Sequence, residues 1–406
     1  MKFKIHIYSI LFFSILTSYR FSSFGQTEVK NFKIITADSI KAGAQRTSLY
    51  FPLLQGKNVA VVANHTAMIG NVHLVDSLIN AGISVKKIFC PEHGFRGGAD
   101  AGEHIKNSFD TKTGIPLISL YGKHYKPRSA ELKGIDVVIY DIQDVGVRFY
   151  TFISTMTYVM EACAENDIPY IVLDRPNPNG FYVDGPVLED NFKSYVGMHN
   201  VPIVYGMTIA EYALMANNEG WLKNGIKCNL KCIPINNYNH TYFYNLSIPP
   251  SPNLPNMNSV LLYPSLGLFE GTIISVGRGT DYPFQIIGHP DLQNTNYKFT
   301  PKSKPGAKTP PFMGVECNGY KLDEFANSYL KNINQIYLYW LTETYKNIQD
   351  KQSFFNSYFK LLAGNATLQQ QIIDGVSEEE IRKSWKNDII KFKKIRKKYL
   401  LYPDFE

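Results

Sequence analysis

The sequence predicts an α/β fold with a doubly wound parallel sheet. Short runs of apolar residues recur through the first half of the chain, and stretches with a helical repeat of apolar residues separate them. Continuous apolar runs are typical of strands covered on both faces, and their alternation with helices indicates βαβ units. A cluster of polar residues follows each run, as expected where ligands bind at the carboxyl ends of parallel strands.

The strands are expected in the segments 57–63, 85–90, 116–120, 136–141 and 169–173. After the first strand, apolar residues between Leu74 and Ile79 form one helical stripe, and Gly82 suits the end of that helix. After the fourth strand, a second stripe runs from Phe149 to Cys163, and Gly146 is expected to open this helix.

The second half of the chain is expected to form a separate domain. A proline-rich stretch near residue 250 favours a boundary between a domain of residues 40–250 and a domain of residues 256–406. A strand followed by a helix is expected around 260–267, and a long helix over 322–347. Ser377 and Glu380 fit a capping box at the start of a further helix.

The N-terminus has the features of a signal peptide. Lys2 and Lys4 precede an apolar run, residues 5–16, that is too short to span a bilayer. We expect cleavage after Gly25, so that residues 1–25 are removed and the protein is exported to the periplasm or secreted. No cysteine stands at the cleavage site, which argues against a lipid anchor, so no stable membrane anchor is expected.

Composition and charge limit the classes of function to consider. An apolar fraction of 44% and a charged fraction of 19% describe a folded soluble protein. The net charge of +7 falls to about +4 without the leader, which does not favour nucleic acid as a partner. The five cysteines are scattered, so we expect free thiols, buried at Cys90 and Cys163, and no disulfide framework.

The polar clusters at the strand ends are the candidate site. Because the carboxyl ends of parallel strands share one rim of the sheet, we expect these residues to converge. The clusters comprise Asn64 and His65; Glu92, His93 and Arg96; Tyr121; Asp141, Gln143 and Asp144; and Asp174, Arg175 and Asn177.

Carboxylates in these clusters suit glycoside cleavage. Glu92 lies in a glycine-rich loop beside Phe95, a setting that suits a general acid. Asp141 and Asp144 follow a neighbouring strand, and two carboxylates facing each other across a cleft can cleave a glycosidic bond. The alternatives are structural: Glu92 could pair with Arg96 at the surface, and either aspartate could pair with Arg148.

Other chemistries find little support. The chain has no G-x-G-x-x-G after its first strand and no phosphate-binding loop, so we expect no nucleotide cofactor. Residues 263–267 have the outline of a nucleophile elbow around Ser265, but Tyr263 stands where that turn needs glycine. No H-E-x-x-H motif is present, so no metal is expected.

A set of longer motifs carries a family resemblance. They are Pro91-Glu92-His93-Gly94-Phe95-Arg96-Gly97, Asp100 to Glu103, Thr113 to Pro116, Ser119 to Gly122, Asp141 to Thr151, Leu173 to Pro178, Gly206-Met207-Thr208 and Glu270 to Thr280. In this order they resemble the bacterial DUF1343 family, the exo-β-N-acetylmuramidases of the NamZ type. Tyr205 and Asp281 depart from that pattern, where the family often has histidine and threonine.

The resemblance implies a Rossmann-like doubly wound sheet domain, a smaller C-terminal α/β domain and a cleft between them. It also implies removal of β-1,4-linked N-acetylmuramic acid (MurNAc) from the non-reducing end of peptidoglycan-derived saccharides such as MurNAc-GlcNAc, with no cofactor. Glu92 is then the favoured catalytic residue. Asp141 as its partner is an inference from the shared rim, and substrate-assisted attack by the sugar's acetamido group stays open.

The remaining candidates are expected to bind substrate. Because MurNAc carries a lactyl carboxylate, a cation such as Arg96, Arg148, Arg175 or Arg278 is needed to recognise it. The loop 270–280 is expected to close one end of the pocket, as exo-action requires. The full set is His93, Arg96, Asp100, Tyr121, Gln143, Asp144, Arg148, Arg175, Asn177, Glu270 and Arg278. A non-catalytic muropeptide-binding protein using the same cleft is the alternative.

Overall fold

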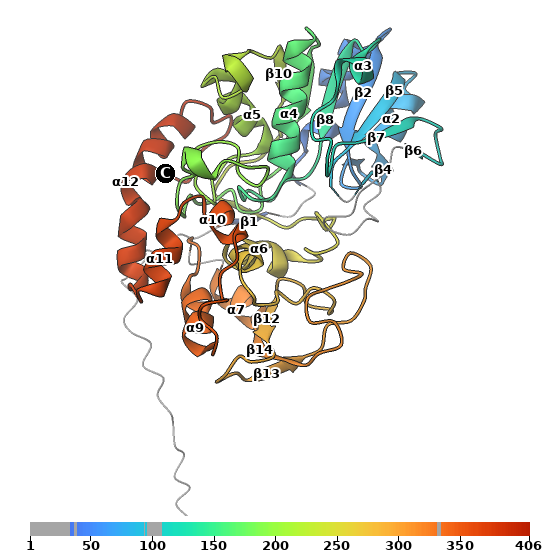
Figure 1. Ribbon diagram of the computed structural model, residues 1–406. Coiled ribbons are helices and arrows are strands. Elements are labelled where there is room, and N and C mark those ends of the chain that lie inside the picture. The colour runs from blue at the N-terminus through green and yellow to red at the C-terminus, as the bar shows by residue number, and fades with distance from the viewer. Residues whose placement is uncertain (1–32, 36–38, 93, 96–107, 331–333) are drawn as a thin grey trace, which may run out of the picture. The chain divides into compact units, whose positions relative to one another are not determined.

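The computed structural model (Figure 1) describes residues 33–35, 39–92, 94–95, 108–330 and 334–406. Within these residues one sheet has seven strands, six of them parallel, with the last pairing antiparallel at the edge. In spatial order they are β10 (Leu230–Ile233), β9 (Tyr170–Leu173), β8 (Val137–Asp141), β2 (Asn58–Ala63), β5 (Ser84–Cys90), β7 (Pro116–Ser119) and β6 (Ser108–Phe109).

The strand order confirms the predicted doubly wound sheet. Numbered along the chain, the six parallel strands lie in the order 3-2-1-4-5-6, which is the Rossmann arrangement. The five expected strands all form, with ends within one residue of the predicted ones; β6 and β10 were not predicted. The order reverses beside β2, which lies between β5 and β8, and ligands bind at such a reversal.

Both faces of the sheet are buried, which explains the continuous apolar runs. Val59, Val61 and Ala63 of β2 pack into one core with α2 (Leu74–Asn80). The alternate residues Ala60 and Val62 pack into a second core. That core contains α4 (Phe152–Glu165) and α5 (Ile209–Asn218), which Figure 1 shows together on one side of the sheet.

The second half of the chain extends the second core. Leu262, Leu362 and Trp385 belong to the same buried cluster as the α4 side of the sheet. Phe32–Glu406 forms one compact unit. A three-stranded antiparallel sheet has the order β12 (Ile286–His289), β14 (Cys317–Lys321) and β13 (Tyr297–Phe299). The helices here are α6 (Met257–Leu266), α7 (Asp323–Phe325), α9 (Tyr339–Asn347), α10 (Tyr358–Ala363), α11 (Thr367–Ile373) and α12 (Glu378–Arg396).

Short elements complete the described chain. β1 (Lys33–Ile35) pairs in parallel with β11 (Tyr242–Tyr244), and β3 (Met68–Ile69) pairs antiparallel with β4 (Val72–His73). The remaining helical segments are η2 (Gly43–Gln45), η3 (Thr47–Leu49), α1 (Phe51–Leu54), α3 (Ser129–Leu132), η4 (Asp190–Phe192), η5 (Lys223–Gly225), η6 (Gly267–Gly271) and η7 (Ala326–Leu330).

Three expectations about helices were wrong. Gly146 does not open a helix: it lies in a loop with φ +75°, and α4 begins at Phe152. The segment 322–347 is not one helix but α7, η7 and α9, and Asn334 between them has a left-handed φ of 50°, which a helix does not accommodate. The segment 260–267 contains no strand, because α6 occupies it up to Leu266. The cap at Ser377 is confirmed, since its hydroxyl accepts the Glu380 N–H at 3.3 Å.

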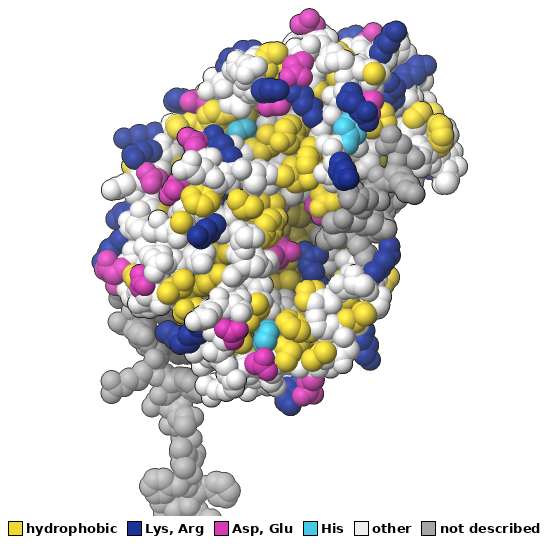
Figure 2. All heavy atoms as spheres, viewed as in Figure 1, with side chains coloured by type: hydrophobic (Ala, Val, Ile, Leu, Met, Phe, Trp, Pro, Cys, Tyr) yellow, Lys and Arg dark blue, Asp and Glu magenta, His cyan; other side chains and the backbone are white. Residues whose placement is uncertain are grey.

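The five cysteines are free, and both Cys90 and Cys163 are buried, as expected. The proposed leader, residues 1–25, lies outside the described residues. In the part of the chain that is described, no helix has the length and apolar character to cross a membrane. Figure 2 shows one face of the molecule. On this face, Lys and Arg side chains are spread out with Asp and Glu among them and do not gather in one basic area.

One buried side chain joins the two halves of the chain. Arg148, in the loop between β8 and α4, is fully buried. Its Nη1 donates to the carbonyl oxygens of Pro186 and Val201, and its Nη2 to those of Leu362 and Ala363, each at 2.8 Å. Burial lowers the pKa of Arg148 to about 9, so the guanidinium stays charged at neutral pH. Arg148 therefore links the segments around Pro186 and Val201 to the end of α10.

We predict that Arg148→Lys destabilises the fold. An ammonium group cannot reach four carbonyl oxygens that a planar guanidinium spans, so buried acceptors lose their donors. We expect the free energy of unfolding to fall by about 3 kcal/mol, measured by urea denaturation. Arg128→Lys is the matched control, because the Arg128 side chain is 70% exposed. Equal unfolding midpoints for the two variants would contradict this role.

Candidate active site

A pocket of about 490 Å³ lies at the rim of the sheet, where residues of both halves of the chain meet. The sheet domain contributes the loops after β5 and β7, the start of α4 and the loop after η4. The second half contributes α6, η6, α10 and the loop before β12. The lining residues are Glu92, Tyr121, Tyr125, Phe149, Tyr150, Thr151, Phe152, Ser194, Tyr195, Val196, Ser251, Asn253, Leu254, Tyr263, Glu270, Arg278, Phe284, Tyr358 and Leu361.

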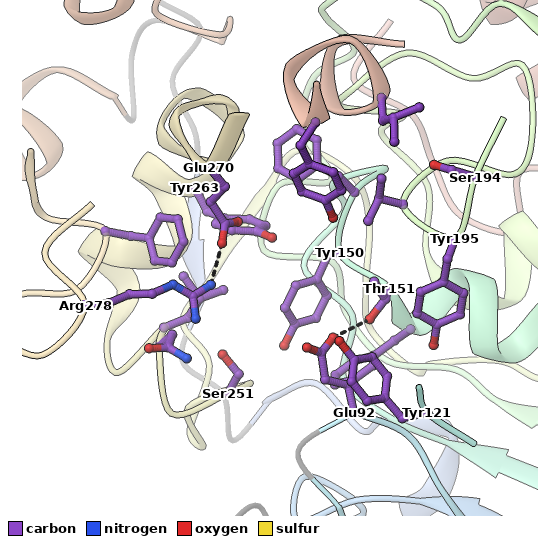
Figure 3. Close-up of a pocket in the computed structure, with 18 of the residues that line it drawn as sticks. Glu92, Tyr121, Tyr150, Thr151, Ser194, Tyr195, Ser251, Tyr263, Glu270 and Arg278 are labelled. Atoms are coloured by element: carbon purple, nitrogen blue, oxygen red, sulfur yellow. Dashed lines mark hydrogen bonds and ion pairs between the residues drawn. The ribbon is translucent and has the colours of Figure 1, made fainter. Parts of the chain in front are cut away.

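Two hydroxyl groups orient the carboxyl of Glu92 in this pocket. Thr151, the N-cap residue of α4, donates from Oγ1 to Glu92 Oε2 at 3.0 Å (Figure 3). The Tyr121 hydroxyl also hydrogen-bonds to Glu92, and burial together with that carboxylate raises the pKa of Tyr121. Tyr121 therefore stays protonated and remains a donor at neutral pH. The two contacts hold Glu92 at the pocket wall.

An ion pair forms the facing wall. Arg278 Nη2 lies 2.6 Å from Glu270 Oε1, and the two side chains are about a fifth to a quarter exposed. Burial acts to lower the pKa of Arg278, but Glu270, Tyr263 and Glu92 together outweigh it, and the net shift is upward. Figure 3 shows this pair on one side of the pocket and Glu92, Thr151 and Tyr121 on the other. Because a guanidinium has five N–H donors, Arg278 can bind a further carboxylate.

Aromatic side chains line the pocket between the two walls. Tyr150 lies between Glu92 and Glu270 in Figure 3, and its hydroxyl donates to the carbonyl oxygen of Pro250 at 3.0 Å. The Arg278 guanidinium lies 5.3 Å from the centre of the Phe284 ring. Apolar walls with a few placed polar groups are typical of small-molecule sites.

Asp141 and Arg175 are not among the residues that line this pocket. Asp141 is fully buried and forms a bidentate pair with Arg175, at 2.6 Å to Nε and 2.8 Å to Nη2. Arg175 also donates to the carbonyl oxygen of Met68 at 3.2 Å. The pair joins the ends of β8 and β9 to the β3 segment. The structure therefore does not bring Asp141 to face Glu92.

Three more predicted residues support the rim from inside. The Gln143 amide donates to the carbonyl oxygens of Asp144 and Pro176, each at 2.8 Å. The Asn177 amide donates to the Met207 carbonyl oxygen at 2.8 Å and accepts the Asn179 N–H. All three side chains, Gln143, Asp144 and Asn177, are buried and do not line the pocket.

Asp144 contacts Tyr205, one of the two residues that depart from the pattern the sequence resembles. Its Oδ2 accepts the Gly146 N–H at 2.7 Å and the hydroxyl of Tyr205, which stands where the family often has histidine. Burial raises the pKa of Asp144 to about 6, and these hydrogen bonds limit the rise. The second departure, Asp281, is exposed and pairs with Lys304.

The predicted site residues thus divide into three groups. Glu92, Tyr121, Glu270 and Arg278 meet in the pocket, whereas Asp141, Gln143, Asp144, Arg148, Arg175 and Asn177 are bound within the rim. His93, Arg96 and Asp100 lie outside the described residues. The pocket also contains Thr151, Tyr195 and Tyr358, which were not predicted. Thr151 ends the motif 141–151 and could have been found there; Tyr358 had no local signal.

Two other chemistries were weighed from the sequence, a serine nucleophile at Ser265 and a metal site. Ser265 lies within α6, and its buried Oγ accepts the Tyr337 N–H at 2.9 Å, so it is not a nucleophile elbow. Among the described residues, no group of three or more His, Cys, Asp and Glu side chains is arranged to hold a metal ion. The pocket itself offers two carboxyl groups and a guanidinium, which suits acid–base chemistry on an anionic ligand.

Comparison with known proteins gives consistent matches over both halves of the chain. The family model of the N-terminal part of the exo-β-N-acetylmuramidase NamZ matches residues 59–258, and that of its C-terminal part matches residues 261–402. The peptidoglycan β-N-acetylmuramidase NamZ of Bacillus subtilis is 38% identical over 383 residues, which cover 87% of this chain and 89% of that protein.

Two solved structures of DUF1343 family proteins from Bacteroides fragilis share the fold. The first is 48% identical with a TM-score of 0.82, and the second is 30% identical with a TM-score of 0.76. Each match covers 90% of this chain and 99% of the other.

Asp144 gives a pH-dependent prediction about stability. Its folded pKa of about 6 exceeds the ordinary value of 3.8, so the folded state holds the proton more tightly between these pH values. Stability from this group is therefore present below pH 4 and is lost as pH rises to 6. Relative to Asp144→Asn, the wild type should lose about 2 kcal/mol between pH 4 and 7 in urea denaturation. A difference that does not change with pH would contradict this, and Asp281→Asn is the exposed control.

Proposed function

The chain belongs to the NamZ family of exo-β-N-acetylmuramidases, and we propose that it releases terminal β-1,4-linked MurNAc from the non-reducing end of peptidoglycan fragments. The observation that carries this proposal is the pocket in which Glu92 lies opposite the Arg278–Glu270 pair. It supplies a proton donor and a cation for an acidic sugar within one cavity. We take MurNAc-GlcNAc to be the minimal substrate.

Glu92 is the proposed proton donor to the leaving sugar. Glycoside cleavage needs a carboxyl group within hydrogen-bonding reach of the glycosidic oxygen. The contacts with Thr151 and Tyr121 orient Glu92 along the pocket wall. When substrate enters, it displaces water from this wall, and hydrogen bonds between Glu92 and the substrate are stronger without competing water.

Glu270 is the proposed second carboxylate. The described part of the pocket lining contains Glu92 and Glu270 as its acidic residues, whereas Asp141 is bound to Arg175 away from it. Arg278 holds Glu270 on the wall facing Glu92, where the carboxylate can stabilise an oxocarbenium-like transition state or activate water.

Arg278 is the proposed partner of the lactyl carboxylate. Arg148 and Arg175 use their donors inside the rim, so among the described residues that line the pocket Arg278 is the cation. A charge-assisted hydrogen bond from a guanidinium favours a sugar with a carboxylate over one without. This supports a preference for MurNAc over N-acetylglucosamine at the cleaved end. We further propose that residues 1–25 direct export, which places the enzyme beside its polymer.

We predict that Glu92→Gln lowers kcat to different extents on two substrates. On MurNAc-GlcNAc, whose leaving group needs a proton, kcat should fall about 1,000-fold. On 4-nitrophenyl MurNAc, whose leaving group needs none, the fall should be about tenfold or less. Both rates are measured by release of MurNAc from purified protein. Equal losses on the two substrates would contradict proton donation, and near-normal disaccharide turnover would contradict any catalytic role.

Two companion variants sharpen this test. Glu316→Gln is the control, because Glu316 is exposed and pairs with Lys298. Glu270→Gln should lower kcat on both substrates with little change in KM, whereas a change in KM alone would mean that Glu270 only positions Arg278. Disaccharide binding without any product from wild-type protein would favour the alternative, a carbohydrate-binding protein.

A further inference from the structure

Four tyrosines form a continuous aromatic cluster that starts at the pocket. Tyr121 follows β7, Tyr125 lies four residues later, Tyr158 lies on α4, and Tyr195 lies in the loop after η4. All four are half-buried, so none is simply part of the core. Tyr121, Tyr125 and Tyr195 line the pocket, whereas Tyr158 lies outside its lining. The cluster, which we name the tyrosine strip, therefore extends beyond the pocket wall.

The rings of the tyrosine strip are ordered by mutual contact. Tyr125 stacks on Tyr195 with ring centres 4.1 Å apart. Tyr158 is stacked on both, at 6.3 Å from Tyr125 and 6.4 Å from Tyr195, and Tyr121 lies 6.2 Å from Tyr195. The Tyr195 hydroxyl hydrogen-bonds with Thr155 Oγ1 at 2.9 Å, which fixes this ring on α4. Such a rigid aromatic surface loses little conformational entropy when a ligand binds.

The position of the strip relative to Glu92 gives the pocket a direction. Tyr121 hydrogen-bonds to Glu92, so the strip begins directly beside that carboxyl group. Glu270 and Arg278 lie on the opposite side of the pocket (Figure 3). A sugar with its carboxylate on Arg278 has Glu92 at its far end, and whatever is attached beyond the cleaved bond meets the tyrosines.

We infer that the tyrosine strip is the subsite for the leaving sugar, an N-acetylhexosamine without a carboxylate. The inference rests on the proposed function, because it takes Glu92 as the group that reaches the glycosidic bond. The C–H faces of a pyranose are apolar and slightly positive, and they suit the negative face of an aromatic ring. The strip thereby binds the aglycone, while Arg278 selects the glycone.

Binding measurements on Tyr125 variants test this subsite. In a Glu92→Gln background, which leaves the substrate intact, isothermal titration gives Kd for MurNAc and for MurNAc-GlcNAc. We expect Tyr125→Ala to weaken disaccharide binding about tenfold while MurNAc binding stays within about twofold. Tyr125→Phe should bind as the parent does, because the ring is retained. Tyr125→Leu, which keeps most of the volume, should behave like Tyr125→Ala.

The outcomes separate this inference from the proposed function. Tyr297→Ala, on β13, is the control for removal of a partly exposed tyrosine outside the pocket lining. Unchanged disaccharide affinity in both Tyr125→Ala and Tyr125→Leu would overturn the subsite, as would an equal weakening of both ligands. If the parent binds neither ligand, the proposed function itself fails and the subsite with it.

Discussion

The pocket depends on a single buried guanidinium. Arg148 satisfies two carbonyl oxygens of the sheet domain and two at the end of α10, and α10 presents Tyr358 and Leu361 to the pocket. A buried charge is costly unless its donors are satisfied, so the fold must keep all four acceptors in place together. The same contacts that solvate Arg148 thereby set the distance between α10 and the sheet, and with it one wall of the cavity.

Polar and charged residues at the rim of the sheet have two different roles, one structural and one in the cavity. Asp141 pairs with Arg175, and Asp144 pairs with Tyr205. These pairs hold loops to one another, and both aspartates are buried. Glu92 follows β5, which is separated from β8 by β2, and it reaches the cavity instead. A rim made rigid by internal pairs suits a catalytic carboxyl, because the residues packed behind a catalytic side chain determine how precisely it is oriented.

The fold was largely predictable, and the site only in part. Buried parallel strands leave a continuous apolar pattern, so the strands and the rim could be placed from the sequence. A strand end fixes where a side chain starts but not which way it points, so Asp141 and Glu92 looked equivalent. The partners of Arg148 lie up to 215 residues away, and Tyr358 comes from a helix that local patterns do not place against the sheet. Such long-range contacts carry no local signal.

The central claim is that one sugar lies between Glu92 and Arg278, and a crystal structure of Glu92→Gln with MurNAc-GlcNAc tests it most directly. We expect the glycosidic oxygen within hydrogen-bonding distance of the amide at position 92, and the lactyl carboxylate on the Arg278 guanidinium. A disaccharide whose carboxylate lies away from Arg278, or whose glycosidic bond lies out of reach of position 92, would contradict the account.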